Sequence, residues 1–157
     1  MNPKAILKGR GAQLNVPNRF FQLSHEQRDD FLEFCHKEGE EPDKNKTLYL
    51  PVFPKTIVNK VTSPDVGMMY SMNPYQGCEH GCVYCYARNS HEFWGFSAGL
   101  DFERRILIKK DAPKLLEQLL KKKSWKAKTI VMSGNTDCYQ PAEKQFDRPD
   151  WWFQLPG

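Results

Sequence analysis

The chemically most informative feature of this chain is a group of three cysteines within one short segment. Cys78, Cys82 and Cys85 follow a C-x3-C-x2-C spacing. Cysteine thiolates hold iron–sulfur clusters, and four of them close a cluster of four irons. Three thiolates would leave one iron open to a ligand that is not protein. Such an iron could hold a small molecule and pass it an electron.

The residues around the cysteines suit a loop that wraps closely around a cluster. Gly77 directly precedes Cys78, and Gly81 directly precedes Cys82. Glycine allows the backbone to take positive φ angles. Backbone N–H groups in such a loop can point at the sulfurs and tune the reduction potential of the cluster.

Three other interpretations of the cysteines stay open. A zinc site could combine them with His80 or His91, because zinc accepts mixed cysteine and histidine ligands. His80 lies between two of the cysteines, so His91 is better placed. A ferredoxin-type carrier would need a fourth thiolate, which Cys138 could supply from far along the chain. Ordinary buried cysteines rarely reach this density beside glycines.

Composition indicates a globular protein of about one domain. The chain has 157 residues, of which 39% are hydrophobic and 27% are charged. No apolar run approaches the ~20 residues of a membrane-spanning helix, and the N-terminus lacks the apolar region of a signal peptide. The odd number of cysteines, five, disfavours a disulfide framework. We therefore expect a cytoplasmic protein without a membrane partner, in a reducing setting that suits an oxygen-sensitive cluster.

Two further features have ordinary interpretations. Cys35 lies on an apolar face of an expected helix, which favours a core thiol. The basic run at residues 121–128 includes Trp125 and could meet phosphates while the ring stacks on a base. The run is more typical of a helix C-terminus whose lysines complement the helix dipole. A net charge of +4 does not by itself indicate a nucleic-acid partner.

The sequence also predicts the elements that must position the cysteine loop. Residues 1–23 are expected to be irregular, and a capping-box pattern at Ser24 and Gln27 begins a helix that ends at Gly39. A helix is expected to begin within residues 87–92. Asp111 is expected to cap another helix, with an apolar stripe of leucines. Extended segments are expected at residues 47–53, 56–61, 68–73, 102–109 and 129–133.

Strands that alternate with helices predict βα units, and therefore an α/β fold with a parallel sheet. The cysteine loop follows the strand expected at residues 68–73. It would lie at the carboxyl end of that strand, where such folds place their ligands.

Four segments of the sequence carry a family resemblance. They are Gly9-Arg-Gly-Ala-Gln-Leu-Asn-Val-Pro-Asn-Arg-Phe20, Ser71-Met-Asn-Pro-Tyr-Gln-Gly-Cys-Glu-His-Gly-Cys-Val-Tyr-Cys-Tyr-Ala-Arg88, Gly99-Leu-Asp-Phe-Glu103 and Ser133-Gly-Asn-Thr-Asp-Cys-Tyr-Gln-Pro-Ala-Glu143. They resemble a subgroup of radical S-adenosylmethionine proteins related to the spore photoproduct lyase and DNA repair photolyase-like group. The first resembles the N-terminal signature of that subgroup, the second its cluster motif, and the other two resemble later blocks.

The resemblance implies that the three cysteines hold a [4Fe-4S] cluster whose open iron chelates S-adenosylmethionine. One electron, from a reductant such as flavodoxin or ferredoxin, would cleave the cofactor and give a 5′-deoxyadenosyl radical that takes hydrogen from a substrate. By family analogy alone, nucleic acid is a possible substrate. The alternative is a non-catalytic zinc or iron–sulfur structural module.

The resemblance also implies residues for the cofactor site. Tyr84 would lie near the adenine, and Tyr86 could line the same pocket. Lys109 and Ser133, at the ends of two expected strands, could touch the cofactor carboxylate or ribose. A solvated charge at a strand end is the more ordinary interpretation of Lys109. The subgroup usually has proline where Cys138 stands, so Cys138 is either a neutral variant or a thiol that handles radicals.

The fold implied by the resemblance is a partial (β/α) TIM-like barrel of the radical S-adenosylmethionine type. Residues 1–66 would form an irregular and helical N-terminal extension, residues 67–144 the first part of the barrel, and residues 145–157 an atypical tail. Because a βα unit takes ~30 residues, only about three units fit. The tail contains Pro149 and crowded aromatics, which indicates a C-terminally shortened chain with little or no turnover.

Overall fold

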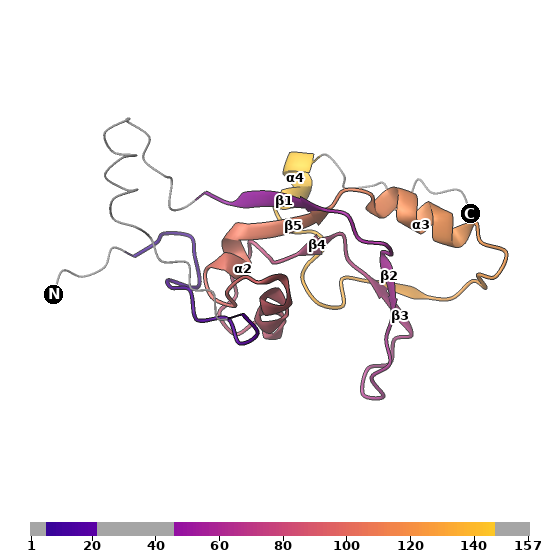
Figure 1. Ribbon diagram of the computed structural model, residues 1–157, viewed down its shortest axis with the longest axis horizontal. Helices are drawn as coiled ribbons and strands as arrows, with labels where there is room; N and C mark the ends of the chain where they lie inside the picture. The colour runs from indigo at the N-terminus through magenta and orange to yellow at the C-terminus, as the bar shows by residue number, and fades with distance from the viewer. Residues whose placement is uncertain (1–5, 22–45, 147–157) are drawn as a thin grey trace.

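The computed structural model describes residues 6–21 and 46–146, and its strands form two three-stranded sheets (Figure 1). The helix expected between Ser24 and Gly39, including Cys35, lies outside the described residues, as does the tail after residue 146. In one sheet the strand order is β1 (Leu48–Val52), β5 (Arg105–Lys109) and β4 (Tyr75–Gln76). In the other it is β2 (Val58–Lys60), β3 (Tyr70–Met72) and β6 (Ile130–Met132).

Each sheet combines a parallel and an antiparallel pair. β1 runs parallel to β5, and β3 runs parallel to β6, with Tyr70 opposite Ile130. β2 and β4 add antiparallel partners to β3 and β5. The described fold is therefore mixed α/β, with the parallel pairing that the sequence predicts in two of its four strand pairs. A TIM-like barrel stays a prediction.

The position of β1 follows from its composition. Leu48, Tyr49 and Val52 favour an extended strand, whereas Pro51 has no N–H to donate. β1 accordingly takes an outer position in its sheet, and β5 is the only described strand that pairs with it.

The described residues contain four helical segments, three of which lie between strands and the last of which follows β6. They are the 3-10 helix η1 (Tyr86–Trp94) and the α-helices α2 (Asp101–Arg104), α3 (Ala112–Leu120) and α4 (Ala142–Phe146). The helix expected within residues 87–92 is thus a 3-10 helix, and it ends at Gly95, whose φ is 81°. Asp111 precedes α3 as expected, but its side chain makes no capping hydrogen bond there.

The strand expected at residues 102–109 begins later than predicted. Residues 101–104 form α2 instead, because the amides of Phe102 and Glu103 bond back to the carbonyls of Gly99 and Leu100. β5 therefore starts at Arg105, and its Ile106, Leu107 and Ile108 are fully buried. This short helix directs the Glu103 side chain toward the cysteine loop.

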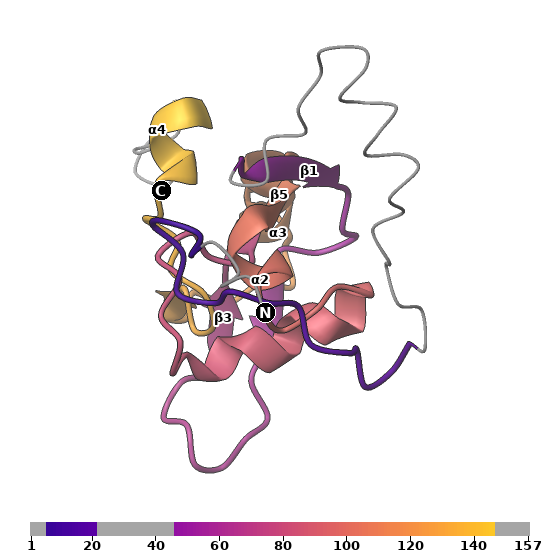
Figure 2. The ribbon, with the colours of Figure 1, turned by 90° about the vertical axis from the view of Figure 1, so that its left-hand side faces the viewer.

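Among the described residues, three small apolar cores hold the elements together. Under α3, Ile57 and Met72 pack with Ala112 and Leu116. Beneath α4, Tyr75 packs with Ile106, Ile108 and Ala142. The third core lies at the cysteine loop, where Cys78 and Ala87 pack against Phe102. Figure 2 shows residues 6–21, drawn in indigo, running beside η1 and α2. In the described ranges, no helix has the length and apolar character needed to cross a membrane.

Candidate metal centre

The cysteine loop begins where β4 ends and is shaped by two glycines. Gly77 and Gly81 have φ angles of 81° and 66°, the left-handed region that the sequence predicts for them. A Cβ at Gly77 would lie 2.9 Å from the Phe102 carbonyl oxygen, and one at Gly81 would lie 2.7 Å from the Glu103 carboxylate. Glycine at these positions therefore lets the loop lie directly on α2.

The three thiols lie on this one loop at different depths. Cys78 is buried, its amide donates to the Phe102 carbonyl at 2.9 Å, and burial raises the pKa of its thiol. Cys82 and Cys85 are half-buried, and the Cys85 amide donates to the Cys82 carbonyl at 3.2 Å. Cys85 packs against the same core as Cys78. The loop thus has one buried thiol and two that reach solvent.

The donor chemistry of the loop fits a thiolate-held cluster, although the thiols are not gathered around a common point. Across residues 6–21 and 46–146, no three histidine, cysteine or acidic side chains are grouped closely enough to hold a metal ion. Three thiols nevertheless share one loop, and the partial exposure of Cys82 and Cys85 gives a cluster a route in.

Of the two histidines that the structure describes, His80 is the one whose ring lies beside a cysteine thiol. Its Nδ1 lies 3.5 Å from the Cys78 Sγ and 3.4 Å from an Asp137 carboxylate oxygen. His91 is fully buried, with its ring beside those of Phe96 and Phe102. This corrects the expectation that His91 is better placed, because the turn between the two glycines folds His80 back onto Cys78.

The two tyrosines expected at the cofactor lie on the exposed side of the loop. Tyr84 is 88% exposed. The Tyr86 hydroxyl donates to the Gly134 carbonyl at 2.9 Å, so this ring joins the loop to the segment after β6. Ser133 lies in that segment with a φ of 76°, and its Oγ accepts a hydrogen bond from the Cys138 amide at 3.1 Å.

Lys109 is partly buried at the end of β5. Its Nζ donates to the Asn73 carbonyl at 2.8 Å, and burial lowers the pKa of its ammonium group. The interpretation of Lys109 as a solvated strand-end charge is therefore wrong, because the ammonium group is bonded to the segment that leads into the cysteine loop.

The segment after β6 closes over the start of the loop. Gln140 is buried; its Oε1 accepts from the Glu79 amide at 3.1 Å, and its Nε2 donates to the Gly77 carbonyl at 3.2 Å. Cys138 is also buried in this segment, and burial raises the pKa of its thiol. Two of the blocks singled out in the sequence thus meet at the loop.

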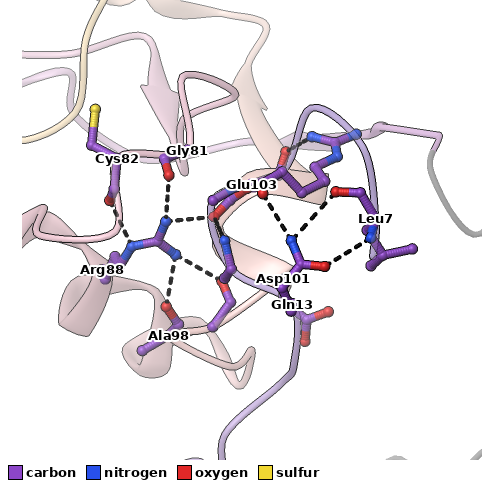
Figure 3. A network of polar contacts seen from close by, with 12 residues as sticks. Leu7, Gln13, Gly81, Cys82, Arg88, Ala98, Asp101 and Glu103 are labelled. Carbon is purple, nitrogen blue, oxygen red and sulfur yellow. Dashed lines mark hydrogen bonds and ion pairs between the residues drawn. The ribbon is translucent and has the colours of Figure 1, made fainter. Parts of the chain in front are cut away.

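A buried ion pair holds the middle of the loop (Figure 3). Arg88 donates to the Gly81 carbonyl at 3.0 Å, to the Cys82 carbonyl at 2.9 Å and to the Glu103 carboxylate. The sequence patterns predict no role for Arg88, Glu103 or Gln140. Their place inside the segments that carry the resemblance is the signal that points to them, since local patterns assign charged and amide side chains to the surface.

Comparison with known proteins gives relatives of undescribed activity. No model of a known protein family matches the chain, and no solved structure matches it. The chain is 36% identical over 106 residues to uncharacterized proteins of Mycobacterium bovis and Mycobacterium tuberculosis, covering 67% of this chain and 31% of each relative.

A further uncharacterized protein, from Methanocaldococcus jannaschii, is 31% identical over 102 residues, covering 65% of this chain and 36% of that protein. The chain therefore spans about a third of the length of these curated relatives.

Proposed function

We propose that Cys78, Cys82 and Cys85 hold a [4Fe-4S] cluster and that its open iron binds S-adenosylmethionine. The observation that carries this proposal is the set of three thiols on one loop whose backbone is fixed at several points. When bound, these groups would supply one-electron chemistry, the reductive cleavage of S-adenosylmethionine that starts radical reactions. The chain belongs, on this proposal, with the radical S-adenosylmethionine enzymes.

The fixed backbone supports the proposal because metal ligands need neighbours that orient them. Gln140 bonds to Gly77 and Glu79 on either side of Cys78. Arg88 bonds to the carbonyls of Gly81 and Cys82. Both sets of bonds use backbone groups of the loop, so the cysteine side chains stay available as ligands.

The exposed face of the loop offers a surface for the cofactor's adenosine. Tyr84 presents nearly its whole ring to solvent next to Cys85, and an aromatic ring can stack on adenine. Tyr86 is oriented by its bond to Gly134 and could line the same site. Contact of Lys109 or Ser133 with the cofactor stays a prediction, since each is bonded within the protein. The electron donor we expect is a flavodoxin or ferredoxin.

Electron paramagnetic resonance of the reduced, anaerobically reconstituted chain tests the proposal. Saturating S-adenosylmethionine should change the cluster signal, because its amino and carboxylate groups would occupy the open iron. Adenosine is the matched control, since it lacks those groups and should leave the signal unchanged. A cluster signal that S-adenosylmethionine leaves unchanged would contradict an open iron in this chain.

A structural zinc site is the second candidate, and the approach of His80 to Cys78 favours it. Zinc accepts three thiolates and one imidazole in a closed tetrahedral site. The two candidates differ in their need for His80. In His80→Ala a zinc site should lose most of its metal, whereas an iron–sulfur site held by cysteines should keep its iron.

A further inference from the structure

An N-terminal segment, which we define as residues 10–19, is bonded along η1, α2 and the turn between them. Asn15 exchanges two hydrogen bonds with Asp101, at 3.0 Å through its amide group and at 2.8 Å through its carbonyl. Val16 exchanges two more with the Ser97 hydroxyl, both at 2.8 Å. The residues that resemble a family N-terminal signature are thus bonded to η1, α2 and the turn between them.

Glu103 is where this N-terminal segment meets the cysteine loop. Its side chain is fully buried, and one carboxylate oxygen accepts from the Gly11 amide at 2.9 Å. The other oxygen accepts from the Ala12 amide at 2.7 Å and from the Arg88 guanidinium. A buried carboxylate is stable only when such donors compensate its charge. The N-terminal segment and Arg88 therefore both bond to the Glu103 carboxylate.

Arg88 carries the connection from Glu103 into the loop. Besides Glu103, it bonds to the carbonyls of Gly81 and Cys82, and its Nη1 donates to the Gly99 carbonyl at 3.0 Å. A lysine could not reproduce this set, because only the planar guanidinium presents several donors in fixed directions.

Direct contact reinforces the connection. A Cβ at Gly11 would lie 1.8 Å from the Gly81 carbonyl oxygen, so the N-terminal segment and the loop touch through their backbones. At the other end of the segment, Glu92 is equally buried and accepts from the Arg19 amide at 3.1 Å and from its Nε at 2.7 Å. Glu92 thus bonds to the segment without bonding to the loop.

We propose that Glu103 is a positioning residue. Its buried carboxylate bonds both to the N-terminal segment and to Arg88, and Arg88 bonds to the cysteine loop. Through these bonds the N-terminal segment fixes the position of the loop for metal binding. The role in metal binding rests on the function proposed above, whereas the role in fixing the position of the loop does not. Glutamine at this position would turn an amide group toward N–H donors that now face an acceptor. The loop would then open while the rest of the fold persists.

Timed alkylation of the metal-free, reduced chain measures this opening, with each thiol read by peptide mass spectrometry. Cys78 is the reporter because it is buried on the loop, and Cys138 is the internal control because it is buried on another segment. In Glu103→Gln the alkylation rate of Cys78 should rise about ten-fold while that of Cys138 stays unchanged, since lost charged hydrogen bonds promote local opening.

Glu92→Gln is the matched control, and it should raise the Cys78 rate by less than about two-fold, because local opening is confined to the bonds that are lost. Equal rises at Cys78 and Cys138 in Glu103→Gln, or equal rises at Cys78 in both variants, overturn the proposal. Where Glu103→Gln does not fold, Arg88→Lys decides the question, since it retains the charge beside Glu103 and should still raise the Cys78 rate selectively.

Iron uptake adds a second readout. After anaerobic reconstitution, Glu103→Gln should hold less than about half of the iron that Glu92→Gln holds, because ligand positioning governs metal affinity. Equal iron in the two variants overturns the link to metal binding. If the unsubstituted chain takes up no iron, the proposed cluster is wrong, whereas selective alkylation of Cys78 still supports the positioning role of Glu103.

Discussion

Gln140 holds the start of the cysteine loop from 61 residues downstream, because its side-chain oxygen accepts a hydrogen bond from the Glu79 amide at 3.1 Å. The same side chain donates to the Gly77 carbonyl at 3.2 Å. Cys78 therefore lies between two backbone groups that one buried amide fixes. The Gln140 side chain therefore links the segment after β6 to the start of the loop after β4, and the two remain separate segments.

Replacing Gln140 by alanine should destabilise this link. The buried Gly77 carbonyl and the half-buried Glu79 amide would lose their partner, which should lower the free energy of unfolding by about 1–3 kcal/mol. Urea denaturation followed by circular dichroism measures the change. Gln118→Ala is the matched control, because Gln118 is exposed on α3, and it should change the free energy by less than ~0.5 kcal/mol. Equal effects of the two substitutions would contradict the role of Gln140.

Gly11→Ala should separate the N-terminal segment from the loop. The added methyl group would overlap the Gly81 carbonyl oxygen, at 1.8 Å, and backbone cannot yield as a flexible side chain can. We expect a loss of about 1–3 kcal/mol in the free energy of unfolding.

Gly67→Ala is the control for this substitution. A Cβ there would meet no atom within 4 Å, so reduced freedom of the unfolded chain should stabilise the protein by about 0.4–1 kcal/mol. Thermal denaturation of both variants gives the comparison. A Gly11→Ala protein as stable as the unsubstituted chain would show that the segment does not pack as described.

Burial of His91 should make the fold sensitive to mild acid. Desolvation lowers the pKa of this imidazole from 6.5 to about 4. Its neutral form is favoured in the folded state, so the contribution to stability is complete above pH 6.5 and is lost as the pH falls toward 4. The loss should reach about 3 kcal/mol at the acid end, since each pKa unit corresponds to ~1.4 kcal/mol.

His91→Leu isolates this effect, because leucine fills the space and cannot be protonated. The difference in the free energy of unfolding between the two proteins, measured by urea denaturation at several pH values, should be constant above pH 6.5 and shift in favour of the variant below it. Parallel pH profiles from pH 6.5 to 4 would contradict a buried, neutral His91.

The sequence predicts well those elements whose residues decide their own conformation. β1, β2, β3 and β6 all fall inside expected extended segments. β-branched residues in β1, β2 and β6, and the aromatic Tyr70 in β3, favour an extended backbone. The sequence does not indicate where β5 begins, because α2 depends on backbone bonds to Gly99 and Leu100. It does not indicate the short strand β4 either, because two residues give no periodic pattern.

The candidate site shows the same division. Spacing predicts that the three cysteines share one loop, and the glycines before Cys78 and Cys82 predict the positive φ angles found there. No local pattern indicates that Glu103 is buried, because its partners Gly11 and Ala12 lie far away in the sequence. His80 and Cys78 are close in the sequence, yet their contact also depends on the conformation of the loop, which no local pattern indicates.

Iron content after anaerobic reconstitution tests the cluster assignment most directly, in the unsubstituted chain, Cys82→Ala and Cys138→Ala. The account predicts a brown protein with about four irons per chain, loss of most iron in Cys82→Ala, and full iron in Cys138→Ala, which removes a buried thiol outside the loop. A colourless protein loaded with zinc, or equal iron in Cys82→Ala and the unsubstituted chain, would contradict it.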